Sequence, residues 1–277
     1  MTYMDDLLVY TKGTIEEHLE QLGKVFGRLE EYGIKLKTSK LNLARHELPY
    51  LGMLVGRNGI RPDPAKTKAV TNMPFPKTLK ELRRALGLFS YYRRFVNNFA
   101  SIAEPLYRMT PKNKNNKKDG NQAIIPIEGA VEAFEALKIA ITSEPVTLIF
   151  PNWDLPFQVH CDASPVGLGA VLSQIVDGKE RVIMYASRSL TSPEKKYEQY
   201  EKETLAIVWA LSLWHVYLYL RPFEIITDCQ ALTWLKNKPL NSRMGEKWLT
   251  RLQEYTFNVK HRAGKVHLNA DPCLELR

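Results

Sequence analysis

The chain has 277 residues, of which 44% are hydrophobic and 25% are charged, and its formal net charge is +9. This length suffices for one large domain or two smaller ones, and the composition is ordinary for a soluble globular protein. No apolar run reaches the roughly 20 residues that a helix needs to span a bilayer. The positive charge favours an anionic partner such as nucleic acid or an acidic membrane surface, although many basic proteins are merely soluble. The three cysteines (Cys161, Cys229 and Cys273) form no CxxC pair, which indicates a reducing compartment and argues against a zinc site.

The first 75 residues are predicted to contain two β-hairpins and a helix. Residues 3–10 place Asp5 and Asp6 between apolar runs, a pattern typical of a hairpin. Thr14 and Glu17 form a capping box for a helix through Leu29. The apolar stripe of that helix is predicted to be Leu19, Leu22, Phe26 and Leu29. Residues 49–55 and the turn after them predict the second hairpin.

Helices dominate the next part of the sequence. Thr78 and Glu81 form a second capping box, and helical, aromatic-rich sequence continues to about Met109. Residues 111–120 are rich in Lys and Asn without apolar periodicity, so they are predicted to be a loop or linker. A short helix is expected from about Ala130 to Ile141.

After Pro156 the pattern changes to strands. Alternating or apolar runs predict strands at 157–161, 166–174, 181–187, 223–227 and 255–261. Ser192 and Pro193 resemble an N-cap followed by proline at the first helical position, which predicts a long helix with Leu205, Val208, Leu211 and His215 on one face. Further helices are expected through Leu235 and at 246–254. Consecutive strands followed by alternating helices and strands predict an α/β (α+β) fold with a five-stranded mixed sheet.

Four carboxylates stand at positions that favour chemistry only when they are considered together. Asp162 ends the first of these strands, Glu203 lies within the long helix, Asp228 ends the fourth strand, and Asp271 is near the C-terminus. Each also has an ordinary interpretation. Asp162 suits a turn, Glu203 suits a solvated helix face, and Asp228 and Asp271 suit helix N-caps.

The order and flanking residues of the four carboxylates resemble the ribonuclease H family. The segments are CDASPVGLGAVLSQ, YEKETLAIVWAL, ITDCQALTWL and HRAGKVHLNAD. With YMDDLLVY, PYLGMLVGRNGIRPDPAKTKAV and ALGLFSYYRRFVNNFASIAEPL, the resemblance extends to the reverse transcriptase and ribonuclease H of gypsy-type long-terminal-repeat retrotransposons. It implies a C-terminal part of the polymerase palm with the primer grip at 1–75, a thumb-like helical segment at 76–112, a linker with a short helix at 113–152, and a ribonuclease H-like domain at 153–277.

The resemblance implies a two-metal site. It assigns metal ligation to Asp162, Glu203, Asp228 and Asp271, with two Mg²⁺ ions that Mn²⁺ can replace. Hydrolysis of a phosphodiester by two such ions needs hard oxygen ligands, and the cations relieve the repulsion between close carboxylates. His261 falls where retroviral relatives place a histidine that aids product release, and its alternative is an ordinary strand-end residue. Gly167 and Gly169 lie within a strand, so they predict close packing or a bulge and not a dinucleotide-binding loop.

The Tyr3-Met4-Asp5-Asp6 segment resembles the second and third metal ligands of a reverse transcriptase. A generic acidic turn is the alternative. The resemblance places the first palm aspartate and the fingers upstream of this segment, so RNA-directed DNA polymerase activity is not expected from this chain alone.

Basic residues gather in the thumb-like segment. The candidates for nucleic-acid binding are Lys77, Lys80, Arg83, Arg84, Arg93 and Arg94, interleaved with aromatic residues. Such a pattern suits a grip on duplex phosphates, and a solvated helix face is the alternative.

The sequence therefore predicts a ribonuclease H that cleaves the RNA strand of an RNA–DNA hybrid. Its expected partners are the hybrid and either a second copy or the remainder of the polymerase, with no membrane. The resemblance implies an intracellular location, in the cytoplasm or a virus-like particle. A non-catalytic, domesticated or decayed nucleic-acid-binding module and a fragment of a longer polyprotein polymerase remain the alternatives.

Overall fold

The computed structural model describes residues 2–3, 6–11, 13–110, 121–143, 147–228 and 243–262. Met4, Asp5, Asp271, the 111–120 segment and the helix expected through Leu235 lie outside these residues. The chain divides into two compact units, Met1–Arg57 and Asn58–Arg277. Within the described residues, no helix is both long and apolar enough to cross a membrane.

The first unit contains two β-hairpins. Strands β1 (Thr2–Tyr3) and β2 (Asp6–Leu7) pair antiparallel, which confirms the first hairpin in a shorter form. Strands β3 (Glu47–Tyr50) and β4 (Met53–Gly56) form another hairpin, whose turn lies at Leu51-Gly52. Their two-residue connection has positive φ at Leu51 (48°) and Gly52 (69°), as a type I′ turn requires. The second hairpin was predicted with its turn after residue 55, so the prediction of an uninterrupted run over 49–55 is wrong.

Helix α1 (Ile15–Glu31) also belongs to the first unit, and its capping box is confirmed. The Thr14 hydroxyl accepts from the Glu17 backbone N–H at 3.3 Å, and the Glu17 carboxylate accepts from the Thr14 N–H at 3.2 Å. The predicted apolar stripe is only partly covered within the described residues, since Leu22 is buried while Leu19 is 58% exposed.

The second unit begins with β5 (Gly59–Pro62) and a layer of helices. These are α2 (Pro64–Thr71), α3 (Leu79–Tyr92), the 3₁₀ turn η2 (Arg93–Phe95), α4 (Phe99–Ile102), α5 (Glu104–Arg108) and α6 (Ala130–Thr142). The Thr78–Glu81 capping box is present at the start of α3. Leu82, Phe89, Phe134 and Leu137 form the buried interior of this layer, where the rings of Phe89 and Phe134 meet edge-on at 5.3 Å.

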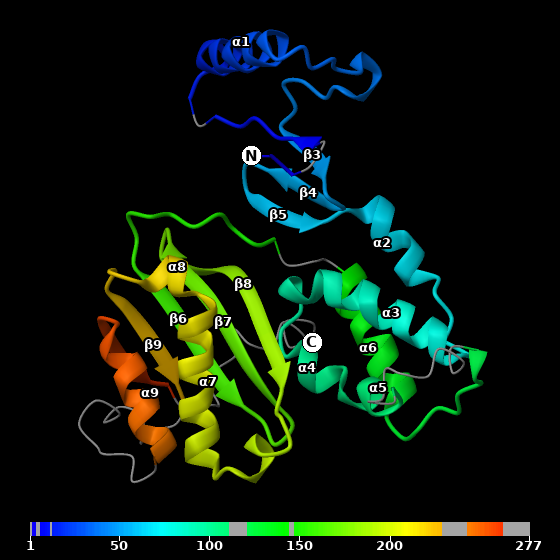
Figure 1. The fold of residues 1–277 in the computed structure, drawn as a ribbon, viewed down its shortest axis with the longest axis vertical. Coiled ribbons are helices and arrows are strands. Elements are labelled where there is room, and N and C mark those ends of the chain that lie inside the picture. The colour runs from blue at the N-terminus through cyan, green and yellow to red at the C-terminus, as the bar shows by residue number, and fades with distance from the viewer. Residues whose placement is uncertain are drawn as a thin grey trace. The chain divides into compact units, whose positions relative to one another are not determined.

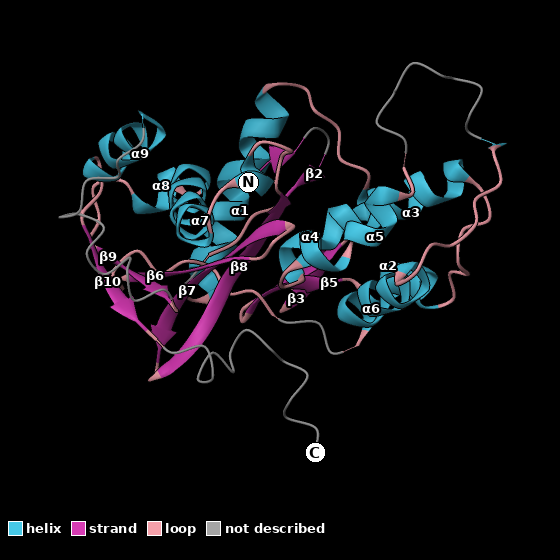
Figure 2. Ribbon diagram, turned by 90° about the horizontal axis from the view of Figure 1, so that it is seen from below, coloured by secondary structure: helices cyan, strands magenta, loops and turns pink. Residues whose placement is uncertain are grey.

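A five-stranded sheet forms the rest of the second unit (Figures 1 and 2). Its strands are β6 (Phe157–Ala163), β7 (Gly167–Val176), β8 (Lys179–Ser189), β9 (Phe223–Thr227) and β10 (Phe257–His261). The spatial order is β10-β9-β6-β7-β8, with β6, β7 and β8 antiparallel and β6, β9 and β10 parallel. The predicted mixed sheet is confirmed.

Helices α7 (Gln199–Leu213), α8 (His215–Leu218) and α9 (Arg243–Gln253) cover one face of this sheet (Figure 1). The predicted helix start at Ser192-Pro193 is wrong. Glu194 binds Arg188 and the Thr191 N–H and opens a single 3₁₀ turn, η4 (Glu194–Lys196). The chain then extends and restarts as α7, with a capping box between Glu198 and Glu201. The predicted helix also ends before His215, which begins α8.

The opposite face of the sheet is covered near β7 and β8 by η2 and α4. Gly169 and Ser187 are cross-strand neighbours there, while the adjacent pair Ala170 and Ala186 faces the helices on the other side. The Ser187 hydroxyl accepts from the Ala100 N–H at 2.9 Å. A Cβ added to Gly169 would lie 2.5 Å from the Asn98 side-chain oxygen, so the prediction of close packing at this glycine is confirmed.

Candidate metal centre

The topology of the sheet brings two of the carboxylates to one edge. Strands β6 and β9 are parallel neighbours, and their carboxyl ends therefore meet. Asp162 is the penultimate residue of β6, and Asp228 directly follows β9. Ligand-binding residues of α/β sheets commonly gather at this position.

The third carboxylate comes from α7. One carboxylate oxygen each of Asp162, Glu203 and Asp228 lies within 4.8 Å of those of the other two. Asp162 and Asp228 are exposed, whereas Glu203 is only 5% exposed. The structure thus brings together three of the four predicted metal ligands, and Asp271 lies outside the described residues.

Glu203 has two differently placed carboxylate oxygens. Its Oε1 accepts a hydrogen bond from the Gln199 side-chain nitrogen at 2.5 Å. Its Oε2 is buried and has no hydrogen-bond partner among the residues that the structure describes. A buried carboxylate oxygen without a donor is costly unless a cation or a proton compensates it.

The surroundings of Glu203 oppose its ionisation. Burial and, next, the negative charge of Asp162 raise the pKa of Glu203 to about 8, while the Gln199 hydrogen bond acts in the opposite direction. Without a cation the side chain holds a proton at neutral pH. This donor set of three carboxylates fits a hard divalent cation such as Mg²⁺ or Mn²⁺.

His261 lies beside this centre, at the end of β10. Its Nε2 is 3.0 Å from the backbone carbonyl oxygen of Asp228, and the Arg262 N–H donates to the Thr227 carbonyl oxygen at 3.0 Å. The end of β10 therefore holds the backbone that carries Asp228. The exposed ring of His261 is thereby held against the backbone of Asp228.

Gln199 is a residue of the centre that the sequence interpretation missed. It is the first residue of α7 and stands one helical turn before Glu203. Both residues lie within the helix predicted from the sequence, so their spacing of four residues, which places them on one face, was readable. The second hydrogen bond of Gln199, to the Ala163 carbonyl oxygen at 2.9 Å, joins residues 36 positions apart and has no local sequence pattern.

The six predicted nucleic-acid-binding residues fall into two groups. Lys77, Lys80, Arg83 and Arg84 are exposed at or near the start of α3. Arg93 is exposed as well, but it donates to the Ser187 backbone oxygen and lies over the Phe99 ring, and Arg94 is half-buried.

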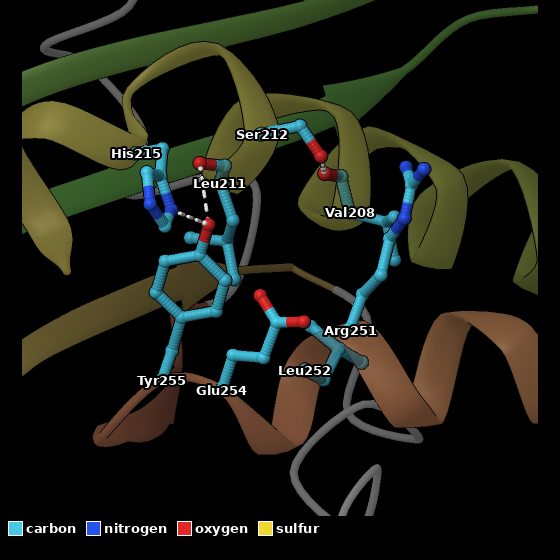
Figure 3. Close-up of a pocket in the computed structure, with 8 residues that line it drawn as sticks. All are labelled: Val208, Leu211, Ser212, His215, Arg251, Leu252, Glu254 and Tyr255. Carbon is cyan, nitrogen blue, oxygen red and sulfur yellow. Dashed lines mark hydrogen bonds between the residues drawn. The ribbon is translucent and has the colours of Figure 1, made fainter.

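A pocket of about 300 Å³ lies away from the carboxylates, between α7 and α9 (Figure 3). Its lining includes Leu211, His215 and Tyr255. The Tyr255 hydroxyl lies 2.7 Å from His215 Nδ1 and donates to the Leu211 carbonyl oxygen at 3.2 Å. These bonds join α7 to the segment after α9, and the pocket includes none of the predicted site residues.

Comparison with known proteins identifies both halves of the chain. A family described as the RNase H-like domain found in reverse transcriptase matches residues 152–255, and the reverse transcriptase (RNA-dependent DNA polymerase) family matches residues 1–55. Two relatives from Drosophila melanogaster are the retrovirus-related Pol polyproteins from transposon opus and transposon 297. They are 36% and 38% identical over 97% and 100% of this chain, which spans only 27% and 25% of their length.

Solved structures of foamy viral protease-reverse transcriptase are similar to this chain in fold. One, designated dRH and in complex with double-stranded DNA, has a TM-score of 0.76 and 26% identity over 91% of this chain and 44% of its own. Another, in complex with an RNA/DNA hybrid, has a TM-score of 0.75 and 28% identity over 91% of this chain and 34% of its own. The chain belongs to the reverse transcriptase–ribonuclease H family of gypsy-type retrotransposon Pol polyproteins.

Proposed function

We propose that this chain hydrolyses the RNA strand of RNA–DNA hybrids with two bound Mg²⁺ ions, for which Mn²⁺ substitutes. The observation that carries the proposal is the cluster of Asp162, Glu203 and Asp228, with the unpaired oxygen of Glu203 buried within it. Close carboxylates of this kind repel one another, and cation binding offsets both the repulsion and the burial of Glu203.

The exposure of each carboxylate indicates its proposed role in the site. Asp162 and Asp228 are open to solvent and to an incoming phosphodiester, whereas Glu203 forms the closed inner wall of the site. Bound Mg²⁺ ions supply activation of the attacking water and stabilisation of the leaving oxygen. Asp271 is proposed as a further ligand from the sequence resemblance. His261, beside the Asp228 backbone, is proposed to assist release of the product.

The exposed side of α3 supports the proposal that the hybrid is held by its phosphates. Lys80, Arg83 and Arg84 lie on this side, and Gly87 follows one turn later. A Cβ added to Gly87 would meet nothing within 4 Å, so none of the described residues would clash with a larger side chain at this position. The missing side chain leaves the surface beside Arg83 and Arg84 open to a closely approaching backbone.

A labelled RNA–DNA hybrid tests the proposal directly. Purified protein is expected to shorten the RNA strand in Mg²⁺ or Mn²⁺ and to be inactive in EDTA. Asp228→Asn is expected to lower kcat by at least about 100-fold with the fold intact, because the amide lacks the charge that holds the cations. Asp154→Asn, which changes an exposed aspartate in a loop, is the matched control. Absence of metal-dependent cleavage by folded protein would contradict the proposal and favour a non-catalytic binding module.

A further inference from the structure

The carboxamide of Gln199 connects the two elements that carry Asp162 and Glu203. Its Nε2 donates one hydrogen bond to the Ala163 carbonyl oxygen at 2.9 Å and one to Glu203 Oε1 at 2.5 Å. Ala163 directly follows Asp162 and is the last residue of β6. One side chain therefore joins the end of the Asp162 strand to the Glu203 carboxylate.

The hydrogen bond from Gln199 makes the two carboxylate oxygens of Glu203 different. Because Oε1 is held by Gln199, the carboxylate cannot rotate without losing that bond. The other oxygen, Oε2, remains buried without a hydrogen-bond donor among the described residues. The result is an oriented oxygen with a free lone pair within the cluster, which is the arrangement that a cation ligand needs.

We propose that Gln199 is a positioning residue that orients Glu203 for cation binding and fixes the spacing between β6 and α7. The inference rests on the proposed metal-dependent function and adds a residue to it. Gln199 acts through Glu203 and the Ala163 backbone and not through contact with the hybrid. Replacing it frees the carboxylate, which then binds the cation with lower affinity.

The same sheet provides a matched comparison for this hydrogen bond. Gln158, also on β6, donates from its Nε2 to the Glu224 carboxylate at 3.0 Å. That pair likewise joins a glutamine to a glutamate across neighbouring elements, but Glu224 belongs to β9 and not to the carboxylate cluster. Gln158→Met thus removes an equivalent bond without touching the site.

The experiment compares wild type, Gln199→Met and Gln158→Met by calorimetric titration with Mn²⁺ alone, before any activity is measured. Gln199→Met is expected to weaken Mn²⁺ binding about 10- to 100-fold, the usual effect of removing a group that orients a ligand. The Gln158→Met affinity should equal that of wild type. In cleavage assays, Gln199→Met should lower kcat at limiting Mg²⁺ and recover partly at high Mg²⁺, with KM for the hybrid unchanged.

Equal Mn²⁺ affinity in wild type and Gln199→Met would overturn the inference, as would a rise in KM alone, which would place Gln199 in contact with the hybrid. If Gln199→Met does not fold, Gln199→Asn, which keeps the amide but shortens its reach, replaces it with the same expected loss of affinity. Wild-type protein that neither binds Mn²⁺ nor cleaves the hybrid would instead contradict the proposed function itself.

Discussion

The guanidinium of Arg93 donates a hydrogen bond to the backbone carbonyl oxygen of Ser187, a residue 94 positions further along the chain. The hydroxyl of the same serine accepts from the Ala100 N–H. These bonds hold η2 and α4 against β8, on the face of the sheet opposite α7. Arg93, although exposed, is therefore also part of the contact between the helical layer and the sheet.

The double change Arg83→Gln and Arg84→Gln is expected to weaken binding to all hybrids alike. The slope of log affinity against log salt is negative. Each phosphate contact that is lost should reduce the steepness of this slope by roughly 0.9, the value for B-form DNA. Titrations with a cleavage-inactive hybrid at several salt concentrations measure this slope. Cleavage at saturating hybrid should change little. An unchanged slope would identify these arginines as an ordinary solvated helix face.

Ser187→Ala is expected to lower stability and leave the salt dependence of binding unchanged. The Ala100 N–H would lose its partner in a buried place, at a cost of about 1–3 kcal/mol. Chemical denaturation measures this loss, and the exposed change Ser212→Ala at the other side of the sheet serves as a control. If Ser187→Ala matched wild type in unfolding free energy, the contact between α4 and β8 would contribute little.

Glu203→Gln is expected to stabilise the metal-free protein at high pH. In the folded state the pKa of Glu203 is raised to about 8, so this group holds its proton well above the 4.5 of an ordinary glutamate. Wild type should therefore lose stability as the pH rises from about 5 through 8, by an amount on the order of a few kcal/mol, since one pKa unit corresponds to about 1.4 kcal/mol.

The glutamine variant has no such proton, so its unfolding free energy should stay level over this range. Thermal melts at several pH values, with and without Mn²⁺, measure the difference. Mn²⁺ should raise the melting temperature of wild type at pH 8 and leave that of the variant nearly unchanged. Parallel pH profiles for the two metal-free proteins would contradict this account of Glu203.

Glu194→Gln is expected to destabilise the protein at neutral pH but not in acid. The pKa of Glu194 is lowered to about 2, mainly by the hydrogen bond that it accepts from Arg188. A lowered pKa contributes stability above pH 4.5 that is lost as the pH falls through 2. Denaturation at pH 7 should show a loss of about 1.5–3 kcal/mol, the range for a hydrogen bond to a charged group. The loss of unfolding free energy should shrink below pH 3. An equal loss at pH 7 and below pH 3 would contradict a lowered pKa for Glu194.

The features predicted correctly from the sequence are those with a local cause. The capping boxes at Thr14 and Thr78 need only two residues three positions apart, and both are present. The strands of the sheet follow from runs of apolar residues, while the placement of Asp162 beside Asp228 follows from the family resemblance. Their contact depends on β6 pairing with β9, which no local pattern specifies.

The misplaced or missed features have long-range causes. The helix predicted from Ser192 fails because Arg188, on β8, fixes Glu194 in a separate turn. The contact of Arg93 with Ser187 was not predicted, since nothing near Arg93 in the sequence indicates Ser187. The role of Gln199 likewise depends on Ala163, which lies on another element.

The antiparallel bridge between Ile60 and Leu148 has a consequence for the order of folding. Two backbone hydrogen bonds, of 2.8 and 2.9 Å, join these residues across the whole helical layer, and a Cβ on Gly59 would collide with the Leu148 carbonyl. A contact between residues so distant in sequence forms late, because the entropy of closing the loop must first be overcome. During synthesis on a ribosome, the helices from α2 to α6 must all emerge before Leu148 can pair with Ile60.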